Sequence, residues 1–251
     1  MQGDVILQTK SLTKAFGDFV AVKDVNLNVR KGTVHAIIGP NGAGKTTCFN
    51  LLTKFLAPTS GEIYFGGRNV TRVGASDSAR MGLVRSFQIS AIFPALTVME
   101  NVRIALQRKR GNSLDFWRSN RCLNVLDAEA IALLEDVGLD HALNSVASSL
   151  PYGQRRALEI ATTLAMSPKL VLLDEPTAGM GVEDVQRTAR LIEQCARDRT
   201  VLMVEHNLEV VADLADTITV LVRGQIAAEG DYKYVSNHPI VQEAYIGVES
   251  D

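Results

Sequence analysis

A glycine-rich segment between an apolar run and a predicted helix carries the clearest chemistry in the sequence. Residues 39–46, Gly-Pro-Asn-Gly-Ala-Gly-Lys-Thr, fit the phosphate-loop pattern G-x-x-x-x-G-K-[ST]. Its glycines let successive backbone N–H groups surround one anion, and the following helix adds its positive end. Lys45 can reach the β- and γ-phosphates, and the Thr46 hydroxyl can coordinate Mg²⁺. The predicted nucleotide-binding residues here are Gly39, Asn41, Gly42, Ala43, Gly44, Lys45, Thr46 and Thr47.

Two carboxylates follow a second apolar run. Residues 170–173 read as a buried parallel strand, and Asp174 and Glu175 come directly after it. Parallel strands deliver their carboxyl-terminal residues to the ligand-binding edge of a sheet. Such a pair alone could be a structural salt-bridge site. Alongside Lys45, it predicts a catalytic site in which Asp174 holds Mg²⁺ and Glu175 orients and deprotonates the attacking water.

One of the four histidines also follows a buried run. His206 comes just after residues 200–204 and is predicted to hydrogen-bond a γ-phosphate oxygen. A histidine in isolation is more commonly a core residue with satisfied hydrogen bonds. That interpretation is kept for the other three, His35, His141 and His238.

Composition narrows the classes of protein. The 251 residues are 46% hydrophobic and 22% charged with a formal net charge of −2, so nucleic acid is not expected as a partner. No apolar run approaches the roughly 18 residues of a membrane span, and the start lacks a secretory pattern. The three cysteines are far apart without metal-like pairing, which predicts a reducing cytosol.

The hydrophobic periodicity predicts an α/β fold. Residues 4–36 contain short period-2 runs, which indicate a small β layer. A helix over residues 183–197 joins the two buried strands in a βαβ unit. The remaining predictions are strands at 5–7, 19–22, 25–29 and 62–65, helices at 48–55, 98–106, 128–136, 154–166 and 241–245, and a final hairpin at 220–226.

Residues 107–127 are a compositional break. Basic residues surround Phe116 and Trp117. One interpretation is a solvated basic surface of a helical lobe. The other is a surface near an anionic leaflet, where each basic residue contributes about 1 kcal/mol.

Taken together, these motifs resemble an ABC-transporter ATPase subunit over essentially the whole chain. The phosphate loop, Gln88, a signature-like segment at residues 150–154, the Asp174–Glu175 pair and His206 occur in that family's order and spacing. The resemblance implies a phosphate-loop NTPase core with an N-terminal antiparallel β layer and an α-helical lobe. It implies one domain over residues 4–250, with core and β layer at about 4–88 and 161–232, helical lobe at about 89–160 and a helical tail at about 233–250.

The resemblance also implies the remaining site residues and partners. In this family two ATPase subunits sandwich two ATP molecules, each between one phosphate loop and the other subunit's signature helix. The aromatic that stacks on adenine matches Phe16, and the glutamine that touches Mg²⁺ and water matches Gln88. The further residues implied to contact ATP are Val22, Pro151, Tyr152, Gly153 and Gln154.

Two positions depart from the family pattern. Pro151 stands where a serine usually bonds the γ-phosphate of the partner's ATP, and losing that bond should cost roughly 1.5–3 kcal/mol of closed-dimer stability. A proline suits the first turn of the signature helix, where its missing N–H is not needed. The segment 177–181 ends in Gly181 where many members end in aspartate, so the usual cross-dimer contact of this loop is not expected.

Residues 39–53, 86–102 and 238–247 resemble the ATPase subunits of branched-chain amino-acid importers. This branch implies a homo- or heterodimer of ATPase subunits, two membrane permease subunits, an indirectly coupled solute-binding protein and a peripheral location on the cytoplasmic face of the plasma membrane. The alternatives are an importer of urea, amides or carboxylates, and a lipid or export system. Two cassettes or a long coiled coil, expected for ABC proteins acting on DNA or ribosomes, are not seen, and a small-molecule kinase would lack the signature.

Overall fold

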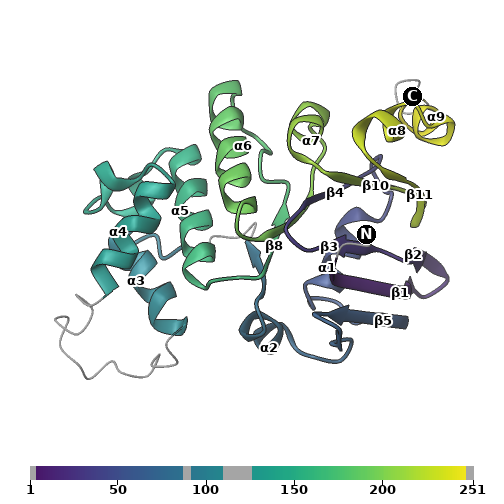
Figure 1. Cartoon of the computed structure of the whole chain (residues 1–251), viewed down its shortest axis with the longest axis horizontal. Coiled ribbons are helices and arrows are strands. Elements are labelled where there is room, and N and C mark those ends of the chain that lie inside the picture. The colour runs from purple at the N-terminus through teal and green to yellow at the C-terminus, as the bar shows by residue number, and fades with distance from the viewer. Residues whose placement is uncertain (1–3, 87–91, 110–125, 247–251) are drawn as a thin grey trace.

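The computed structural model describes residues 4–86, 92–109 and 126–246. Its centre is a six-stranded sheet in which β4 lies between β10 and β9, in the order β11-β10-β4-β9-β8-β7 (Figure 1). All neighbours pair in parallel except β11, which is antiparallel to β10. The strands are β4 (Val34–Ile38), β7 (Leu83–Ser86), β8 (Leu170–Asp174), β9 (Thr200–Val204), β10 (Thr217–Val222) and β11 (Gln225–Gly230).

A second, antiparallel sheet forms the N-terminal layer. Its order is β2-β1-β5-β6, and β3 also pairs with β1. It lies below the six-stranded sheet in Figure 1, which agrees with the predicted β layer. The strands are β1 (Val5–Phe16), β2 (Phe19–Val25), β3 (Asn28–Arg30), β5 (Ser60–Phe65) and β6 (Arg68–Asn69).

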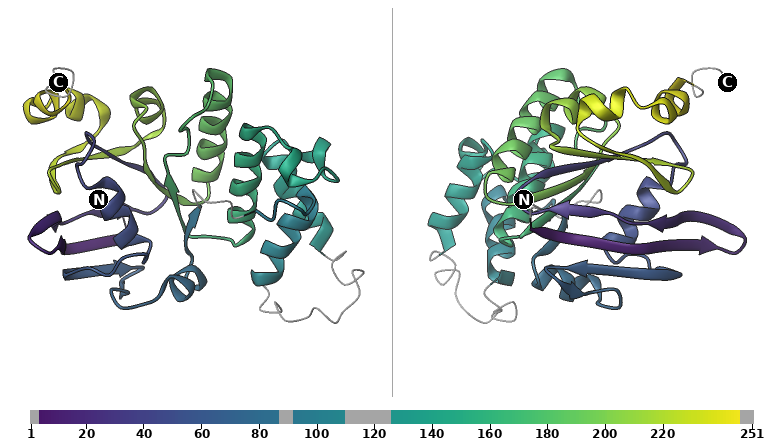
Figure 2. Two further views of the ribbon diagram at one scale, coloured as in Figure 1. Left: turned by 180° about the vertical axis from the view of Figure 1, so that it is seen from behind. Right: turned by 45° about the vertical axis from the view of Figure 1, so that its right-hand side comes forward.

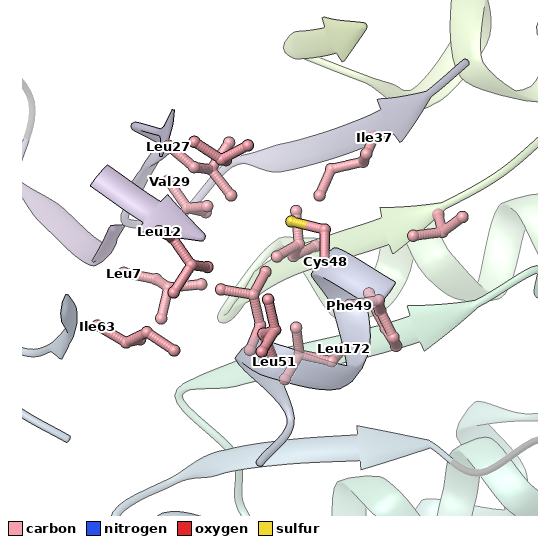
Figure 3. Close-up of a cluster of buried hydrophobic side chains, with 14 of the residues drawn as sticks. Leu7, Leu12, Leu27, Val29, Ile37, Cys48, Phe49, Leu51, Ile63 and Leu172 are labelled. Carbon is pink, nitrogen blue, oxygen red and sulfur yellow. The ribbon is translucent and has the colours of Figure 1, made fainter. Parts of the chain in front are cut away.

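The helix α1 (Lys45–Leu52) fills the space between the two sheets. Its residues Cys48, Phe49 and Leu51 are at most 1% exposed and pack in one cluster with residues of both sheets. Figure 3 shows these side chains between Leu7 and Ile63 of the β layer and the strands of the six-stranded sheet. The helix after the phosphate loop therefore packs against both sheets.

Alternation along the buried strands builds a second core on the other face. In β8, Leu170 and Leu172 face α1, whereas Val171 and Leu173 join the opposite cluster, as a period of two requires. Four helices cover that face and contribute buried residues to the cluster. They are α6 (Val182–Ala196), α7 (Leu208–Leu214), α8 (Tyr232–Ser236) and α9 (Pro239–Ile246).

Helices α3 (Val98–Lys109), α4 (Asp127–Asp136) and α5 (Tyr152–Ala165) form a helical lobe beside the sheets (Figure 2). They share a separate hydrophobic cluster. Leu191 and Cys195 of α6 join this cluster, so α6 packs against both the lobe and the sheet. The lobe also has short 3₁₀ turns at Asp140–Ala142 and Ala147–Ser149, and the short helix α2 (Ala75–Arg80) precedes β7.

The structure confirms the βαβ unit formed by β8, α6 and β9, and the final hairpin. The single strand predicted over 25–29 is wrong, because the chain leaves the ladder there. The Asn26 side chain accepts a hydrogen bond from the Ser11 N–H, and the Leu27 N–H donates to the Thr9 hydroxyl. The run is thus divided between β2 and β3.

The first strand is longer than predicted. β1 continues to Phe16 through an irregularity, where Ser11 has φ 46° and the pairing with β5 shifts between Lys10 and Thr13. The short helices α7 and α8 were not predicted, because few apolar residues fit into so short a segment. In the part of the chain that the structure describes, no helix combines the length and apolar character needed to cross a membrane.

Candidate functional site

The phosphate loop connects the central strand β4 to α1. At Gly39 a Cβ atom would collide with the Leu221 carbonyl oxygen, and at Gly44 with the Ala21 carbonyl oxygen. Gly44 also has φ 93° and is the N-cap of α1. Only glycine can hold both positions without displacing backbone, so the packing around the loop dictates Gly39 and Gly44.

Lys45 lies inside this loop. Its Nζ donates to the carbonyl oxygens of Gly39 at 2.7 Å and Pro40 at 3.0 Å. Burial lowers the pKa of Lys45, and the nearby negative charge of Glu175 opposes that shift. The amine is therefore close to the predicted catalytic carboxylate, and it is bonded to the carbonyl groups of the loop that it is predicted to complete.

The rest of the loop is open to a ligand. Asn41, Gly42 and Thr46 are exposed, whereas Ala43 is buried and can offer only backbone. Among the described residues no side chain caps α1, so its first N–H groups are left for an anion. Thr47, half-buried, follows Thr46 on the first turn.

Asp174 and Glu175 lie where the sequence predicted, at the carboxyl end of β8. Asp174 is 2% exposed, and its Oδ2 is 2.6 Å from Nη2 of Arg85. Glu175 is a non-glycine residue with φ 44°, and its N–H donates to the carbonyl of Val204 on β9 at 2.9 Å. A left-handed backbone costs roughly 1–3 kcal/mol, and such residues gather at functional sites.

His206 also lies at this edge, directly after β9. Its side chain is 60% exposed, and its Nδ1 is 3.9 Å from Oε1 of Glu205. The histidine is thus free to turn toward a ligand. Its predicted bond to a γ-phosphate stays a prediction. His35, by contrast, is buried with its Nε2 2.7 Å from the Thr219 hydroxyl, as expected of a core histidine.

Glu205 was missed by the sequence reasoning. It is fully buried, and its Oε1 accepts hydrogen bonds from the Thr177 hydroxyl at 2.7 Å and the Asn207 N–H at 3.3 Å. Within the described residues its Oε2 has no partner. Glu205 therefore ties the segment after Glu175 to the segment that carries His206. The signal available was a charged residue directly after an apolar strand.

Two arginines at Asp174 were also missed. Arg85 pairs with its carboxylate, and Arg156 donates from Nη2 to its backbone carbonyl at 3.2 Å. Arg156 also pairs with Glu159 on the same helix, at 2.6 Å. Arg85 adjoins the segment predicted for Gln88, and Arg156 adjoins the signature, so proximity to these motifs was the signal that could have found them.

The signature segment begins helix α5. Pro151 is its N-cap, with extended backbone angles, so the prediction of a first-turn proline is wrong by one position. Among the described residues no side chain caps this helix end. The carboxylate of Asp184 lies so near Gly153 that a Cβ there would be 2.6 Å from it, and the Tyr152 hydroxyl donates to the Ala178 carbonyl at 3.3 Å. Gln154 lies 3.5 Å from the His141 ring nitrogen.

A cavity of about 310 Å³ joins the signature helix to the catalytic edge. Tyr152 and Arg155 line it from α5, Glu175 and Ala178 from the segment after β8, and Pro94 from the helical lobe. The structure therefore brings the signature helix of this chain beside Glu175.

The remaining predicted positions are Phe16 and Val22 in the β layer, and Gln88 and the basic segment. Phe16 is 49% exposed at the end of β1, so ring surface is available for stacking although the Lys14 amine lies over the ring, 5.1 Å from its centre. Val22 is fully buried in the core, and its predicted contact with ATP stays a prediction. Gln88 and residues 110–125 of the basic segment lie outside the described residues.

The donor set suits Mg²⁺ bound together with a nucleotide. Thr46 offers a hydroxyl and Asp174 a carboxylate, both hard oxygen donors. Among the described residues no three acidic, histidine or cysteine side chains form a metal cluster. Mg²⁺ is held by one or two carboxylates plus substrate phosphates rather than by an all-protein cage, so these residues fit it.

A phosphate loop follows β4, and two acidic residues stand at the carboxyl end of β8, the next strand but one in a largely parallel sheet. Together these features define a phosphate-loop nucleotide hydrolase. A family model described as ABC transporter matches residues 22–178. The branched-chain amino acid transport ATP-binding protein BraF of Pseudomonas aeruginosa is 37% identical, covering 96% of this chain and 98% of its own. LivG of Salmonella typhimurium is 36% identical with the same coverage.

Solved structures agree with this similarity. The ADP conformation of MJ1267, an ATP-binding cassette of an ABC transporter, has a TM-score of 0.83 and 33% identity and covers 97% of this chain and 99% of its own. The dimeric cassette MJ0796 bound to ADP and phosphate has a TM-score of 0.74 and 25% identity, with 90% and 98% covered. The chain belongs to the ABC-transporter ATP-binding family and is an ATPase of that family.

Proposed function

We propose that the chain is the ATP-hydrolysing, energy-coupling subunit of an ABC importer for branched-chain or related amino acids. The observation that carries this proposal is similarity along nearly the full chain to proteins named for branched-chain amino acid transport. The phosphate loop after β4 and the carboxylates Asp174 and Glu175 at the end of β8 lie at one edge of the sheet, and this supports ATP hydrolysis as its energy source.

Each residue at the catalytic edge has a part in this reaction. Lys45 exchanges its loop carbonyl partners for the β- and γ-phosphates, since charge-assisted bonds to phosphate are stronger. Glu175 orients and deprotonates the attacking water, and His206 bonds a γ-phosphate oxygen. Thr46, Asp174 and Gln88 hold Mg²⁺, which when bound neutralises charge on the phosphates. Phe16 stacks on adenine.

The complete site needs a second cassette. The N-terminal end of α5 presents Pro151, Tyr152, Gly153 and Gln154, and no side chain among the described residues caps it, which suits the γ-phosphate held by another chain. The ADP- and phosphate-bound MJ0796 cassette is a dimer, and this supports the arrangement. We propose that two cassettes, identical or related, close on two ATP molecules.

We further propose that the cassette pair binds two membrane permease subunits on the cytoplasmic face of the plasma membrane. The solute-binding protein contributes only through those subunits. The cavity lined by Pro94, Tyr152 and Glu175 supports this proposal, because it joins the helical lobe to the catalytic edge. A subunit docked there could sense the state of the nucleotide.

The division of the chain is proposed on the same basis. One ABC ATPase domain spans residues 4–250, with the helical lobe at about 89–160 and the C-terminal tail from about 233. The separate hydrophobic cluster of α3, α4 and α5 supports the lobe, and the packing of α6 against both clusters supports a single domain.

Uptake assays test the transported class. Cells lacking this gene would be complemented with wild type or with Glu175→Gln and given labelled leucine, other amino acids, urea and small carboxylates. The proposal predicts uptake of leucine or a related amino acid only with the wild-type gene. Uptake of urea or carboxylates alone would replace the substrate class, and no change in any uptake would favour a lipid or export system.

A further inference from the structure

Arg85 makes contacts that the phosphate-loop chemistry described above does not require. Its Nη2 is 2.6 Å from Asp174 Oδ2, and the two side chains are only 11% and 3% exposed. Its Nη1 donates to Asn50 Oδ1 at 2.9 Å and lies 3.4 Å from the Thr53 hydroxyl. One guanidinium therefore fixes the carboxylate of β8 relative to the helix that follows the phosphate loop.

Two aromatic rings complete the surroundings of this guanidinium. Its central carbon lies 5.1 Å from the ring centre of Phe49 and 4.9 Å from that of Phe55. Its Nε is buried without a partner among the described residues. The guanidinium suits such a site because it is a planar and weakly hydrated cation. A lysine ammonium cannot stack on the aromatic rings in the same way, and it cannot donate to two acceptors from one plane.

The position of Arg85 in the chain adds a second connection. It lies on β7, in register with Leu172 of β8, and Gln88 follows three residues later. Arg85 is thus joined at once to Asp174, to α1 and to the strand that leads into Gln88. These are the segments assigned to the metal in the proposed function.

We propose that Arg85 is a positioning residue for the Mg²⁺ site, which it serves by holding the Asp174 carboxylate in a fixed orientation against α1. This proposal rests on the proposed role of Asp174 toward Mg²⁺. Arg85 acts through Asp174, and no contact with the nucleotide is assigned to it. Side chains that orient metal ligands are typically worth 10–100-fold in metal affinity, even though they make no bond to the metal.

The test is ATP affinity measured with a fluorescent ATP analogue, in EDTA and across a Mg²⁺ titration. For wild type, Mg²⁺ should tighten binding. For Arg85→Lys, we expect affinity in EDTA within about two-fold of wild type and an apparent Mg²⁺ affinity lowered about 10–100-fold. Arg103→Lys is the matched control, because Arg103 pairs with Asp127 at 2.6 Å in the helical lobe. It should leave both values unchanged.

Asp174→Asn separates this proposal from the one on which it rests. If Asp174→Asn loses the Mg²⁺ response and Arg85→Lys keeps it within about two-fold of wild type, the inference about Arg85 is overturned and the role of Asp174 stands. If Asp174→Asn itself keeps the full Mg²⁺ response, the assigned role of Asp174 fails and the inference fails with it.

Melting temperature in EDTA checks that each variant is folded. If Arg85→Lys does not fold, Asn50→Ala decides, because it removes one acceptor of the guanidinium while leaving the ion pair with Asp174 in place. A fall in apparent Mg²⁺ affinity of at least about three-fold, with EDTA affinity unchanged, supports the proposal. An unchanged Mg²⁺ titration overturns it.

Discussion

The phosphate-loop core and the signature helix differ in how many of their polar groups have a hydrogen-bond or charge partner within this chain. In the core, Lys45 is bonded to the loop, Asp174 is paired with Arg85, and Glu205 bridges to Thr177. The start of α5 has an N-cap proline and, among the described residues, no capping side chain. The core is internally connected, while the helix end is left for a partner.

This difference indicates a division of labour. A connected core can keep its geometry without ligand, because Lys45, Asp174 and Glu205 each have an opposite charge or a hydrogen bond beside them. An uncapped helix start retains free N–H groups that can bind an anion supplied from outside. One half of the site is thus preformed, and the other half acts only when a phosphate arrives with the second chain.

The largest expected effect comes from the core carboxylate. Glu175→Gln should lower the ATP hydrolysis rate by about 10²–10⁴-fold, because it removes the proposed general base. ATP binding should persist, since the phosphate loop is untouched, and an ATP-bound dimer should accumulate. Phosphate release and light scattering measure the two effects. Hydrolysis at the wild-type rate would contradict the assignment of Glu175.

Acid should weaken the core through His35. Burial, aided by the positive charge of Arg30, lowers the pKa of His35 from 6.5 to about 4. Between pH 6.5 and 4 the histidine is protonated in the unfolded chain but stays neutral in the folded chain. The free energy of unfolding therefore falls by up to about 3 kcal/mol as the pH is lowered from 6.5 to 4. Denaturant unfolding at several pH values measures the loss.

His35→Gln supplies the comparison for this pH effect. The amide can still bond the Thr219 hydroxyl, which lies 2.7 Å from the ring nitrogen in the wild type, but it does not titrate. Its stability should depend less steeply on pH between 6.5 and 4, whereas the exposed His141→Gln should match wild type. An equally steep loss in His35→Gln would show that other groups cause it.

Lys45→Ala should weaken nucleotide binding strongly. Removing a charge-assisted hydrogen bond costs about 1.5–3 kcal/mol, which corresponds to roughly 10–150-fold weaker ATP affinity. A fluorescent nucleotide titration measures it, with the exposed Lys31→Ala as the control. Affinity within about two-fold of wild type would show that the bonds of Lys45 to the loop carbonyls are not exchanged for phosphate.

A substitution in the signature helix should strengthen the ATP-bound dimer, whereas the substitutions in the core weaken binding or hydrolysis. Pro151→Ser restores a hydroxyl at the N-cap of α5 and should strengthen the ATP-bound dimer by about 1.5–3 kcal/mol. The dimer dissociation constant in a Glu175→Gln background measures the gain. Pro151→Ala lacks the hydroxyl and should not show it. Equal gains for serine and alanine would mean that the ring, rather than the missing hydroxyl, weakens the contact.

Local patterns were enough to predict the phosphate loop and the two buried strands. Gly39 to Thr46 and the apolar runs before Asp174 and His206 each carry their signal within a few residues. Contacts between distant segments could not be predicted in this way. Arg85 and Asp174 are 89 positions apart, and their pairing exists only because β7 and β8 lie side by side.

The same reasoning explains the errors in the fold. The break between β2 and β3 depends on hydrogen bonds from Ser11 to Asn26 and from Leu27 to Thr9, which join different parts of the layer. The cover over β2 is likewise tertiary, because Val22 is buried where α1 packs against that strand. A pattern along one strand cannot show what covers it, so tertiary contacts decided these positions.

Mixing two inactive variants tests whether one chain's phosphate loop works with another chain's signature helix. Lys45→Ala damages the loop alone, and Gly153→Asp damages the signature alone, since any side chain there meets the Asp184 carboxylate. A mixed dimer of this chain contains one fully intact site if sites form between chains. We expect an equal mixture to recover roughly a quarter of wild-type hydrolysis, because about half of the dimers are mixed and each has one working site of two. A mixture no more active than the two variants measured separately would contradict it.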